Sequence, residues 1–304
     1  MPLVAMIARL PAVWPGYRCP VASPGWLIRC ARGVVGALCA LPLAGALASP
    51  AYADSLPSAA ISAPSLLFSD DFDGPAGSPP NPAYWDYDVG RWGEGAGELQ
   101  YYTDRTDNAR LDGNGALEII ARPEQYSGAS YTSARLQTRE KESFQPPVRI
   151  ESRIQMPAGT GLLSAFWTVG TDLFTRGWPQ CGEIDIVEVK GDSPLGAQFH
   201  THSASSSGGD YSVGDVWTSP LSLTDGFHGY RVDWYDTRIE FYLDGALRFT
   251  VARPNMPFET WAFSSSHYLT LNTAVGNRWI GPPDRTTQWP AVMRVDWVKA
   301  WTLG

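Results

Sequence analysis

Residues 181–188 read Cys-Gly-Glu-Ile-Asp-Ile-Val-Glu. Three carboxylates in this run stand among apolar, mostly β-branched residues: Glu183, Asp185 and Glu188. On a β-strand alternate side chains share a face, so Glu183 and Asp185 point to the same side. Glu188 is one residue out of step, and it rejoins them only if a β-bulge near Ile186 or Val187 absorbs one residue. The run therefore predicts a bulged strand with three acids on one face.

The spacing of these acids is compatible with glycoside hydrolysis. With one residue absorbed, Glu183 and Glu188 are about four strand steps apart, roughly 13 Å between their Cα atoms. Side chains that lean together can close this to the roughly 5 to 5.5 Å of a retaining glycosidase, whereas inverting enzymes need about 6.5 to 9.5 Å. The alternative is a solvated strand face. Like charges crowded on an otherwise apolar strand repel, however, and such crowding usually serves chemistry.

Short alternating apolar runs between turn signals predict an all-β fold. We expect strands over residues 66–72, 116–121, 133–138, 148–156, 162–169, 182–189, 197–202, 231–234, 238–243, 269–274 and 293–301. Asp244-Gly245 predicts a tight hairpin turn. Ten or more short strands predict a β-sandwich of two packed antiparallel sheets.

Residues 1–53 have the composition of a secretory signal peptide. They contain four arginines and no acidic residue, and an apolar run over 33–48 precedes a small-residue site that ends at Ala53. The run is too short for a membrane span. We expect cleavage near Ala53, a flexible leader over residues 54–66, which are rich in Ser, Ala and Pro, and one catalytic domain over 67–304.

The charge balance restricts the partners. Without the signal the net charge of −8 becomes −12, because the signal carries four positive charges and no negative one. An acidic protein repels nucleic acid and anionic membranes. We therefore expect a secreted monomer that binds a neutral polymer, with no nucleic-acid or membrane partner.

Cysteine and histidine spacing predicts neither a disulfide nor a zinc site. Three of the four cysteines lie in the signal, so Cys181 is left without a partner. No histidine is near Cys181 in sequence, and we expect a buried small side chain in place of a nucleophile. No His-x-x-x-His or paired-cysteine pattern occurs.

Eleven tryptophans follow residue 53. Trp234 and Trp297 lie in alternating strands, where core packing is expected. Trp92, Trp178 and Trp279 stand in loops beside Gly or Pro, and their flat faces suit pyranose rings. For each one packing and sugar stacking are both open, but as a group they predict a carbohydrate groove.

The run from Gly177 to Glu188 resembles the active-site strand of glycoside hydrolase family 16, in the bulged form typical of laminarinases, the endo-β-1,3-glucanases. Further similar stretches cover almost the whole domain: 67–74, 98–103, 107–110, 131–136, 271–276 and 295–298. The resemblance implies a jelly-roll β-sandwich of two curved antiparallel sheets with a substrate cleft on the concave face.

The resemblance also implies roles for individual residues. Glu183 would be the nucleophile, Glu188 the general acid/base, and Asp185 the carboxylate that orients and tunes the nucleophile. Neighbouring carboxylates raise the pKa of Glu188 until Glu183 is esterified, so one cluster serves both half-reactions without a cofactor. Six side chains are implied as sugar contacts: Asn108, Arg135, Trp167, Trp178, His200 and Asn272.

Other implications concern histidines and a metal. His200 matches a family histidine beside the nucleophile, whereas His202 has no such counterpart, and His228 is expected to be structural. A structural Ca²⁺ would join the first and last strands through Asp71, a backbone carbonyl near Gly113, and Asp296. The family usually has Glu in place of Asp71.

Three departures from the family pattern fall near the minus subsites. Leu163 stands where Trp is frequent, Gly97 where Asn is common, and Asn277 where a second Gly is frequent. We expect a secreted retaining endo-glycosidase that hydrolyses internal β-1,3 linkages of laminarin-like β-glucan. The alternatives are a hydrolase of another β-glycan, mixed-linkage glucan or galactan, and a non-catalytic β-glucan-binding protein.

Overall fold

The computed structural model describes residues 63–256 and 261–304. The expected signal, residues 1–53, and most of the expected leader, residues 54–66, lie outside the described residues. The first strand, β1 (Leu66–Asp70), begins at the last residue of that leader. None of the helices in the described ranges is long and apolar enough to cross a membrane.

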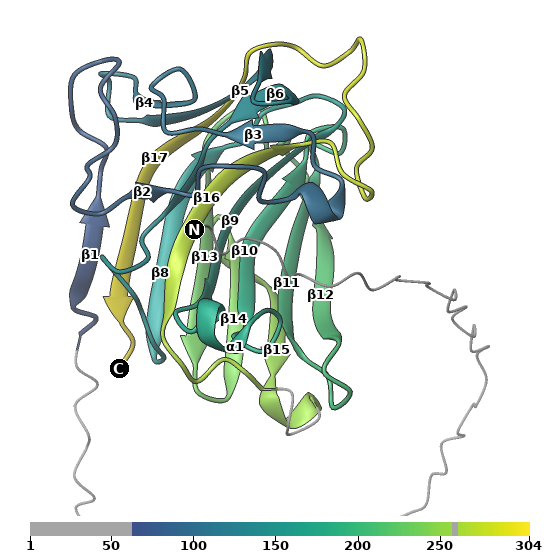
Figure 1. Cartoon of the computed structure of the whole chain (residues 1–304). Helices are drawn as coiled ribbons and strands as arrows, with labels where there is room; N and C mark the ends of the chain where they lie inside the picture. The colour runs from purple at the N-terminus through teal and green to yellow at the C-terminus, as the bar shows by residue number, and fades with distance from the viewer. Residues whose placement is uncertain (1–62, 257–260) are drawn as a thin grey trace, which may run out of the picture. The chain divides into compact units, whose positions relative to one another are not determined.

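Two stacked sheets make up the described domain (Figure 1). The ten-stranded sheet runs β15-β14-β13-β8-β17-β5-β6-β3, with β1 paired to β17 and β4 to β5. Its other strands are β3 (Gln100–Tyr102), β4 (Ala109–Leu111), β5 (Leu117–Tyr126), β6 (Ala129–Ser133), β8 (Val148–Gln155), β13 (His228–Tyr235), β14 (Arg238–Leu243), β15 (Ala246–Ala252) and β17 (Ala291–Thr302). The pair β3–β6 is parallel, while the other pairs of this sheet are antiparallel.

The seven-stranded sheet is antiparallel and runs β12-β11-β10-β9-β16-β7-β2. It contains β2 (Asp86–Tyr87), β7 (Arg135–Gln137), β9 (Leu162–Gly170), β10 (Glu183–Lys190), β11 (Gly196–Ala204), β12 (Asp210–Thr218) and β16 (His267–Val275). Short helical turns lie in the connections: η1 (Glu94–Ala96), α1 (Leu173–Arg176) and η2 (Arg253–Asn255). The expected all-β jelly-roll sandwich is confirmed.

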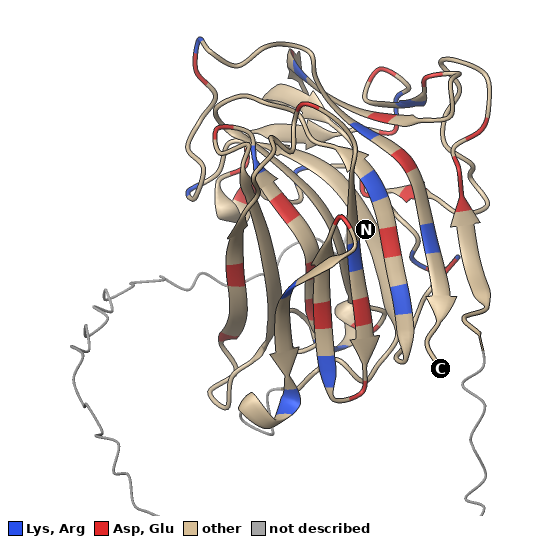
Figure 2. Cartoon of the chain, turned by 180° about the vertical axis from the view of Figure 1, so that it is seen from behind, with Lys and Arg blue, Asp and Glu red and all other residues tan. Residues whose placement is uncertain are grey.

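The core lies between the two sheets and follows from strand alternation. On β8, Val148, Ile150 and Ile154 are fully buried, while Arg149 between them points outward and pairs with Asp233 at 2.7 Å. Burial of each large apolar side chain contributes about 1.5–3 kcal/mol. Acidic and basic residues recur along the strands of this sheet, at positions between the buried ones (Figure 2).

Strands β9 and β16 are buried at every position, unlike the strands of the ten-stranded sheet. A strand buried on one face only alternates in exposure, so both faces of these two strands must be covered. One face packs into the core, and the other lies at the bottom of a groove on the outer face of the seven-stranded sheet.

Strand β10 contains the predicted bulge. Asp185 lies opposite Trp167 of β9 and Val187 opposite Phe166, so Ile186 is the extra residue. Ile186 and Val187 are both buried in the core, and Glu188 returns to the face of the other two acids. The predicted position of the bulge is confirmed.

One predicted core residue is wrong. Trp234 is buried as expected, and its Nε1 donates to the carbonyl of Phe263 at 2.9 Å. Trp297 is only half-buried, because the pairing of β17 with β8 shifts between Val295 and Trp297. The shift turns Trp297 outward, where the ammonium group of Lys299 lies 5.4 Å from its ring centroid.

The expected hairpin turn is present, but several short strands were not predicted. Asp244 and Gly245 have positive φ values of 51° and 75°, as a tight turn between β14 and β15 requires. The missed strands are β2, β3, β4, β6 and β12. All but β12 have five residues or fewer, which is too short for a clear alternation.

Candidate active site

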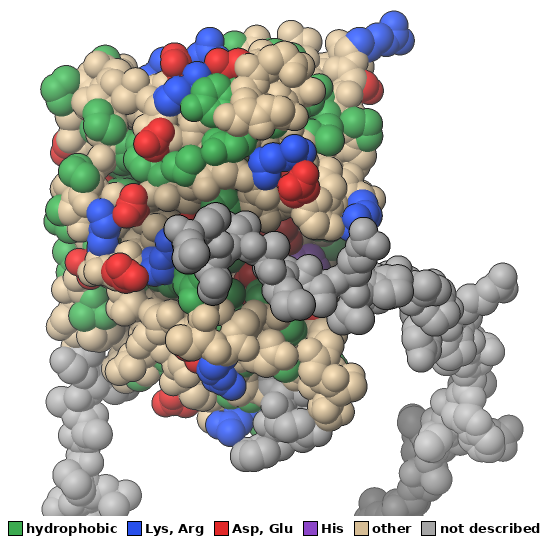
Figure 3. Space-filling model, in the orientation of Figure 1, with side chains coloured by type: hydrophobic (Ala, Val, Ile, Leu, Met, Phe, Trp, Pro, Cys, Tyr) green, Lys and Arg blue, Asp and Glu red, His purple; other side chains and the backbone are tan. Residues whose placement is uncertain are grey.

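The three acids of β10 line one groove on the outer face of the seven-stranded sheet. A cavity of about 190 Å³ contains Glu183, Asp185 and Glu188 in its wall. A second cavity of about 440 Å³ adjoins it, and Arg135, Trp167 and Glu183 line both. Glu183 therefore lies where the two parts of the groove meet. Figure 3 shows acidic, hydrophobic and histidine side chains beside one another on this face.

Trp178 lies in the loop between α1 and β10 and holds the first acid. Its Nε1 donates a hydrogen bond to Oε2 of Glu183 at 3.1 Å, while 47% of the residue surface stays exposed. The indole forms part of the larger cavity. The same side chain can therefore orient Glu183 and offer an aromatic face to a ligand.

His200 on β11 lies beside Glu188, with 3.4 Å between Nδ1 and Oε2. The resemblance implied a position beside the nucleophile, and the contact that the structure shows is with the proposed acid/base. Across the bulge the register shifts, so that Asp185 faces His200 and Glu188 faces Gln198. The bulge tilts Glu188 back toward the His200 ring. His200 therefore contacts Glu188, which follows Glu183 on β10 after the bulge.

Burial controls the protonation of the pair. Burial, followed by the charge of Asp185, raises the pKa of Glu183. Burial also raises the pKa of Glu188, against an opposing contribution from His200. Two neighbouring carboxylates do not both ionise easily, and the increase in pKa is the larger one for Glu183. The hydrogen bond from Trp178 favours the ionised form of Glu183 and so opposes this increase.

His202, two residues after His200, is a site residue that the sequence analysis missed. Its Nε2 lies 3.3 Å from Oδ2 of Asp185, and its Nδ1 lies 3.0 Å from Oδ2 of Asp210. Burial alone would lower the pKa of His202, but the contacts with Asp185 and Asp210 and the charge of Glu183 raise it to about 11. The available signal was the strand period, which puts positions 200 and 202 on one face.

Three of the predicted sugar contacts form one polar network in the groove. Trp167 Nε1 donates to Oδ1 of Asn272 at 2.8 Å, and Asn272 Nδ2 donates to the hydroxyl of Tyr102 at 3.1 Å. The guanidinium of Arg135 lies 4.6 Å from the Trp167 ring centroid and pairs with Asp88 at 3.0 Å. These contacts fix the side chains before any ligand binds, which lowers the entropy cost of binding.

Glu98 is a second groove residue to which the sequence analysis assigned no role. Gln100 and Tyr102 donate hydrogen bonds to its carboxylate, and burial raises the pKa of Glu98. Gly93 packs directly against that carboxylate, because a Cβ at position 93 would lie 1.9 Å from Glu98 Cδ. Alternation from 98 to 102 could have indicated that these side chains share a face.

One departure from the family pattern, Leu163, lines the groove, and another, Asn277, shapes a nearby loop. Leu163 forms part of the smaller cavity and packs on Ala274 and Ile280, so no aromatic ring stands at that wall. Asn277 Oδ1 accepts hydrogen bonds from the amides of Trp279 and Ile280. Its side chain therefore shapes the loop that carries the exposed Trp279.

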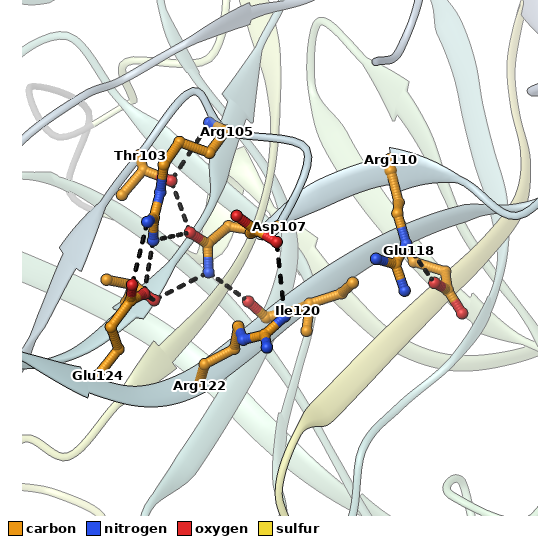
Figure 4. A network of polar contacts seen from close by, with 10 residues as sticks. Thr103, Arg105, Asp107, Arg110, Glu118, Ile120, Arg122 and Glu124 are labelled. Atoms are coloured by element: carbon orange, nitrogen blue, oxygen red, sulfur yellow. Dashed lines mark hydrogen bonds and ion pairs between the residues drawn. The ribbon is translucent and has the colours of Figure 1, made fainter. Parts of the chain in front are cut away.

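Asn108 does not lie in the groove, and its predicted role as a sugar contact is wrong. The side chain is fully buried: its Oδ1 accepts from Thr103 at 2.6 Å and from Arg105 at 3.1 Å, and its Nδ2 donates to the carbonyl of Ile120 and to Thr132. Figure 4 shows this network, in which Arg105 also pairs with Glu124. Asn108 ties a loop to β5 and β6.

The two carboxylates expected to bind Ca²⁺ are both engaged in ion pairs with basic side chains. Asp71 pairs with Lys299 at 2.8 Å, and Asp296 pairs with Arg153 at 2.6 Å. Each carboxylate is already neutralised by a different basic side chain. Gly113 instead adopts a positive φ of 81° and packs against Ala76.

Among the described residues, one compact group of acidic and histidine side chains could be considered for a metal ion: Glu183, Asp185 and His202. Glu183 accepts the hydrogen bond from Trp178, and Asp185 and His202 form an ion pair with each other. The predictions that Cys181 is a buried small side chain and that His228 is a structural residue are confirmed. Cys181 is buried with its pKa raised to about 11 by burial, and His228 bonds to Asp244 and the carbonyl of Ser222.

Two half-buried glutamates on a bulged strand, in a groove lined by tryptophans and by polar groups fixed in place, define a glycoside hydrolase. The chain belongs to the family described as Glycosyl hydrolases family 16, whose model matches residues 97–299.

Three similar proteins illustrate this membership. A Beta-glucanase of Rhodothermus marinus is 39% identical over 248 residues, which cover 78% of this chain and 84% of that protein. The endo-beta-1,3-glucanase structure from Pyrococcus furiosus is 36% identical with a TM-score of 0.72, covering 79% of this chain and 95% of that one. The laminarinase structure from Rhodothermus marinus is 35% identical with a TM-score of 0.72, covering 80% and 98%.

Proposed function

We propose that this protein is a retaining endo-glycosidase that hydrolyses internal β-1,3 linkages of a laminarin-like β-glucan. The observation that carries the proposal is the return of Glu188 to the face of Glu183 across the Ile186 bulge. The relatives named above act on β-glucans by their printed names, and their similarity extends over most of the domain.

The proposed reaction has two steps. In the first, the ionised Glu183 attacks the anomeric carbon while Glu188 donates its proton to the glycosidic oxygen, which leaves with the bonding electrons. In the second, Glu188 takes a proton from water, the water oxygen bonds to the anomeric carbon, and Glu183 departs as carboxylate. Esterified Glu183 is uncharged, so the pKa of Glu188 falls between the steps and Glu188 becomes a base.

Asp185 supports the nucleophile without bonding to the sugar. It lies on the same face of β10 as Glu183, two residues along, and is 4% exposed. The buried negative charge of Asp185 needs a positive partner, and His202 supplies it. Asp185 thereby links the nucleophile to β11.

The groove supports binding along a polymer. Its two cavities adjoin at Glu183, so sugar units can occupy both sides of the reacting bond. Trp92 and Trp178 line the larger cavity and are both more than 40% exposed, as stacking on pyranose faces requires. A non-catalytic β-glucan-binding protein would have no use for three acids gathered in one groove, and this observation favours the enzyme.

Substrate choice is tested by one experiment. Purified protein is incubated with laminarin, lichenan and agarose, and new reducing ends are counted. We expect the highest rate on laminarin, with short oligosaccharides appearing before glucose. A higher rate on lichenan would support mixed-linkage glucan as the substrate, and a higher rate on agarose would support a galactan. No hydrolysis with retained laminarin binding would support the binding protein.

We also propose that the protein is secreted as a monomer after cleavage near Ala53. The support is the arginine-rich, apolar composition of residues 1–53 and the absence of acids there. The amino-terminal sequence of protein from the culture medium of a secreting host should begin at Asp54. Retention of the full-length chain inside the cells would contradict this, and gel filtration of the mature protein tests the monomer.

The family resemblance leaves one metal proposal, a structural Ca²⁺ at Asp71 and Asp296. To bind there, Ca²⁺ would have to displace Lys299 and Arg153 from their ion pairs. A cation that binds only the folded state raises the melting temperature by mass action. If EDTA and Ca²⁺ leave the melting temperature unchanged, the site does not exist in this chain.

A further inference from the structure

His202 lies between two carboxylates from two neighbouring strands. Nε2 is 3.3 Å from Asp185 on β10, and Nδ1 is 3.0 and 3.1 Å from the two carboxylate oxygens of Asp210 on β12. A neutral imidazole carries no charge, so the ion pair with Asp185 and the hydrogen bond to Asp210 exist together only in the imidazolium form.

We propose that His202 is a positioning residue for the nucleophile: clamped between Asp185 and Asp210, it holds a fixed positive charge beside Asp185 and keeps Glu183 ionised. The inference deepens the proposed function and rests on Glu183 as the nucleophile. It assigns Asp210 as the anchor of that charge.

Asp185 shows why a cation is needed there. Among the described residues, no hydrogen-bond donor with standard geometry reaches its buried Oδ2. The ion pair with His202 is therefore the interaction that compensates this charge. An uncompensated charge beside Glu183 would favour the protonated nucleophile, which cannot attack the sugar.

The other charged groups around His202 do not replace this ion pair. Glu183, Asp185 and Glu188 face it from β10, and Asp210 faces it from β12. His200, on the same strand, has its ring centroid 6.1 Å away and contacts Glu188 instead. Arg135 on β7 lowers the pKa of Glu183 less than His202 does.

The β11–β12 hairpin supplies the anchor. Asp210 is the first residue of β12 and lies opposite Ala204, just after the turn over 205–209. This register sets Asp210 beside the ring of His202. Trp178, whose ring centroid is 5.8 Å from that of His202, covers it on the groove side. The charged ring of His202 therefore lies between Asp210 of the hairpin and Trp178 of the groove.

The test is the pH dependence of kcat/KM on laminarin for wild type, His202→Gln and Asp210→Asn. The acidic limb is the fall in kcat/KM toward low pH. We expect it to lie about one pH unit higher in His202→Gln than in wild type. At pH values below the limb kcat/KM should therefore be about tenfold lower than in wild type, and at pH values above it the loss should be much smaller. Asp210→Asn should move the limb in the same direction by a smaller amount. Asp215→Asn is the matched control, because Asp215 is exposed on the same strand and bonds only to the amide of Val216.

An unchanged limb in folded His202→Gln, or an equal loss at every pH, would overturn the proposal. If His202→Gln fails to fold by circular dichroism, Asp210→Asn decides the question by the same criterion. Wild type and Glu183→Gln are measured in the same assay. Activity in Glu183→Gln would reject the nucleophile itself, whereas an inactive Glu183→Gln beside an unchanged His202→Gln would reject only the role of His202.

Discussion

Trp178 donates a hydrogen bond from Nε1 to Oε2 of Glu183 at 3.1 Å, so an exposed tryptophan of the groove also holds the nucleophile. Hydrogen bonds to a charged group typically contribute about 1.5–3 kcal/mol, and the exposure of Trp178 places this one at the lower end. The loop before β10 therefore contributes to catalysis as well as to binding.

Trp178→Phe separates these two contributions. The aromatic face remains and the donor is lost, so we expect kcat to fall about tenfold with a much smaller change in KM. Trp92→Phe is the matched control, because Trp92 lines the same cavity but donates to the carbonyl of Val89. Equal effects of both substitutions on kcat would contradict the role of the Trp178 donor.

Removal of either glutamate should abolish hydrolysis. Glu183→Gln cannot form the glycosyl ester, and Glu188→Gln removes proton transfer, which typically contributes about 10²–10⁴ in rate. Asp185→Asn should reduce kcat less, because Asp185 does not bond to the sugar. Reducing ends released from laminarin report activity, and circular dichroism reports folding. A folded Glu183→Gln variant with wild-type activity would reject the assignment.

Gly93 and Gly95 provide a paired test of the loop above the groove. A Cβ at position 93 would lie 1.9 Å from Glu98 Cδ, whereas a Cβ at position 95 would have no neighbour within 4 Å. Gly93→Ala should push the half-buried Glu98 out of its hydrogen bonds and raise KM for laminarin several-fold, by about 1 kcal/mol of binding. Gly95→Ala should leave KM unchanged. Equal KM values in the two variants would show that Glu98 does not shape the groove.

His267 makes the fold sensitive to acid. It is fully buried, contacts Thr168 Oγ1 at 3.0 Å, and its pKa is lowered to about 3 by burial. The unfolded chain binds this proton near pH 6.5, so the free energy of unfolding decreases as pH falls from about 6.5 toward 3. The slope is at most about 1.4 kcal/mol per pH unit.

His267→Gln should remove this contribution. Urea unfolding of wild type and variant between pH 7 and pH 4 measures it, and the stability difference should shift in favour of the variant as pH falls. His228→Gln is the control, because His228 is hydrogen bonded to Asp244 near the surface. A stability difference that is independent of pH would show that His267 binds its proton in the folded state as readily as in the unfolded chain.

The sequence predicted the features that depend on one strand at a time. The bulge follows from the spacing of Glu183, Asp185 and Glu188, and the hairpin turn follows from Asp244-Gly245, because local backbone geometry decides both. The alternation of long strands of the ten-stranded sheet, such as β8, likewise located the core.

Features that depend on pairing between strands were not predicted. His202 reaches Asp185 only through the register of β10 with β11, and Trp297 turns outward only because β17 shifts against β8. Asn108 was wrongly predicted for a different reason. The family resemblance matched the residue but gave no information on its surroundings, and the side chain is buried with its hydrogen bonds made inside the protein. A single sequence contains no direct information on such registers.

The central claim, a double displacement by Glu183 and Glu188, is tested most directly by proton NMR of laminarin hydrolysis. Retention requires the shorter separation of the two carboxyl groups, and it releases the β-anomer first. We predict that β-anomer signals appear at once and that α-anomer signals grow in only through mutarotation. An initial release of the α-anomer would contradict the account.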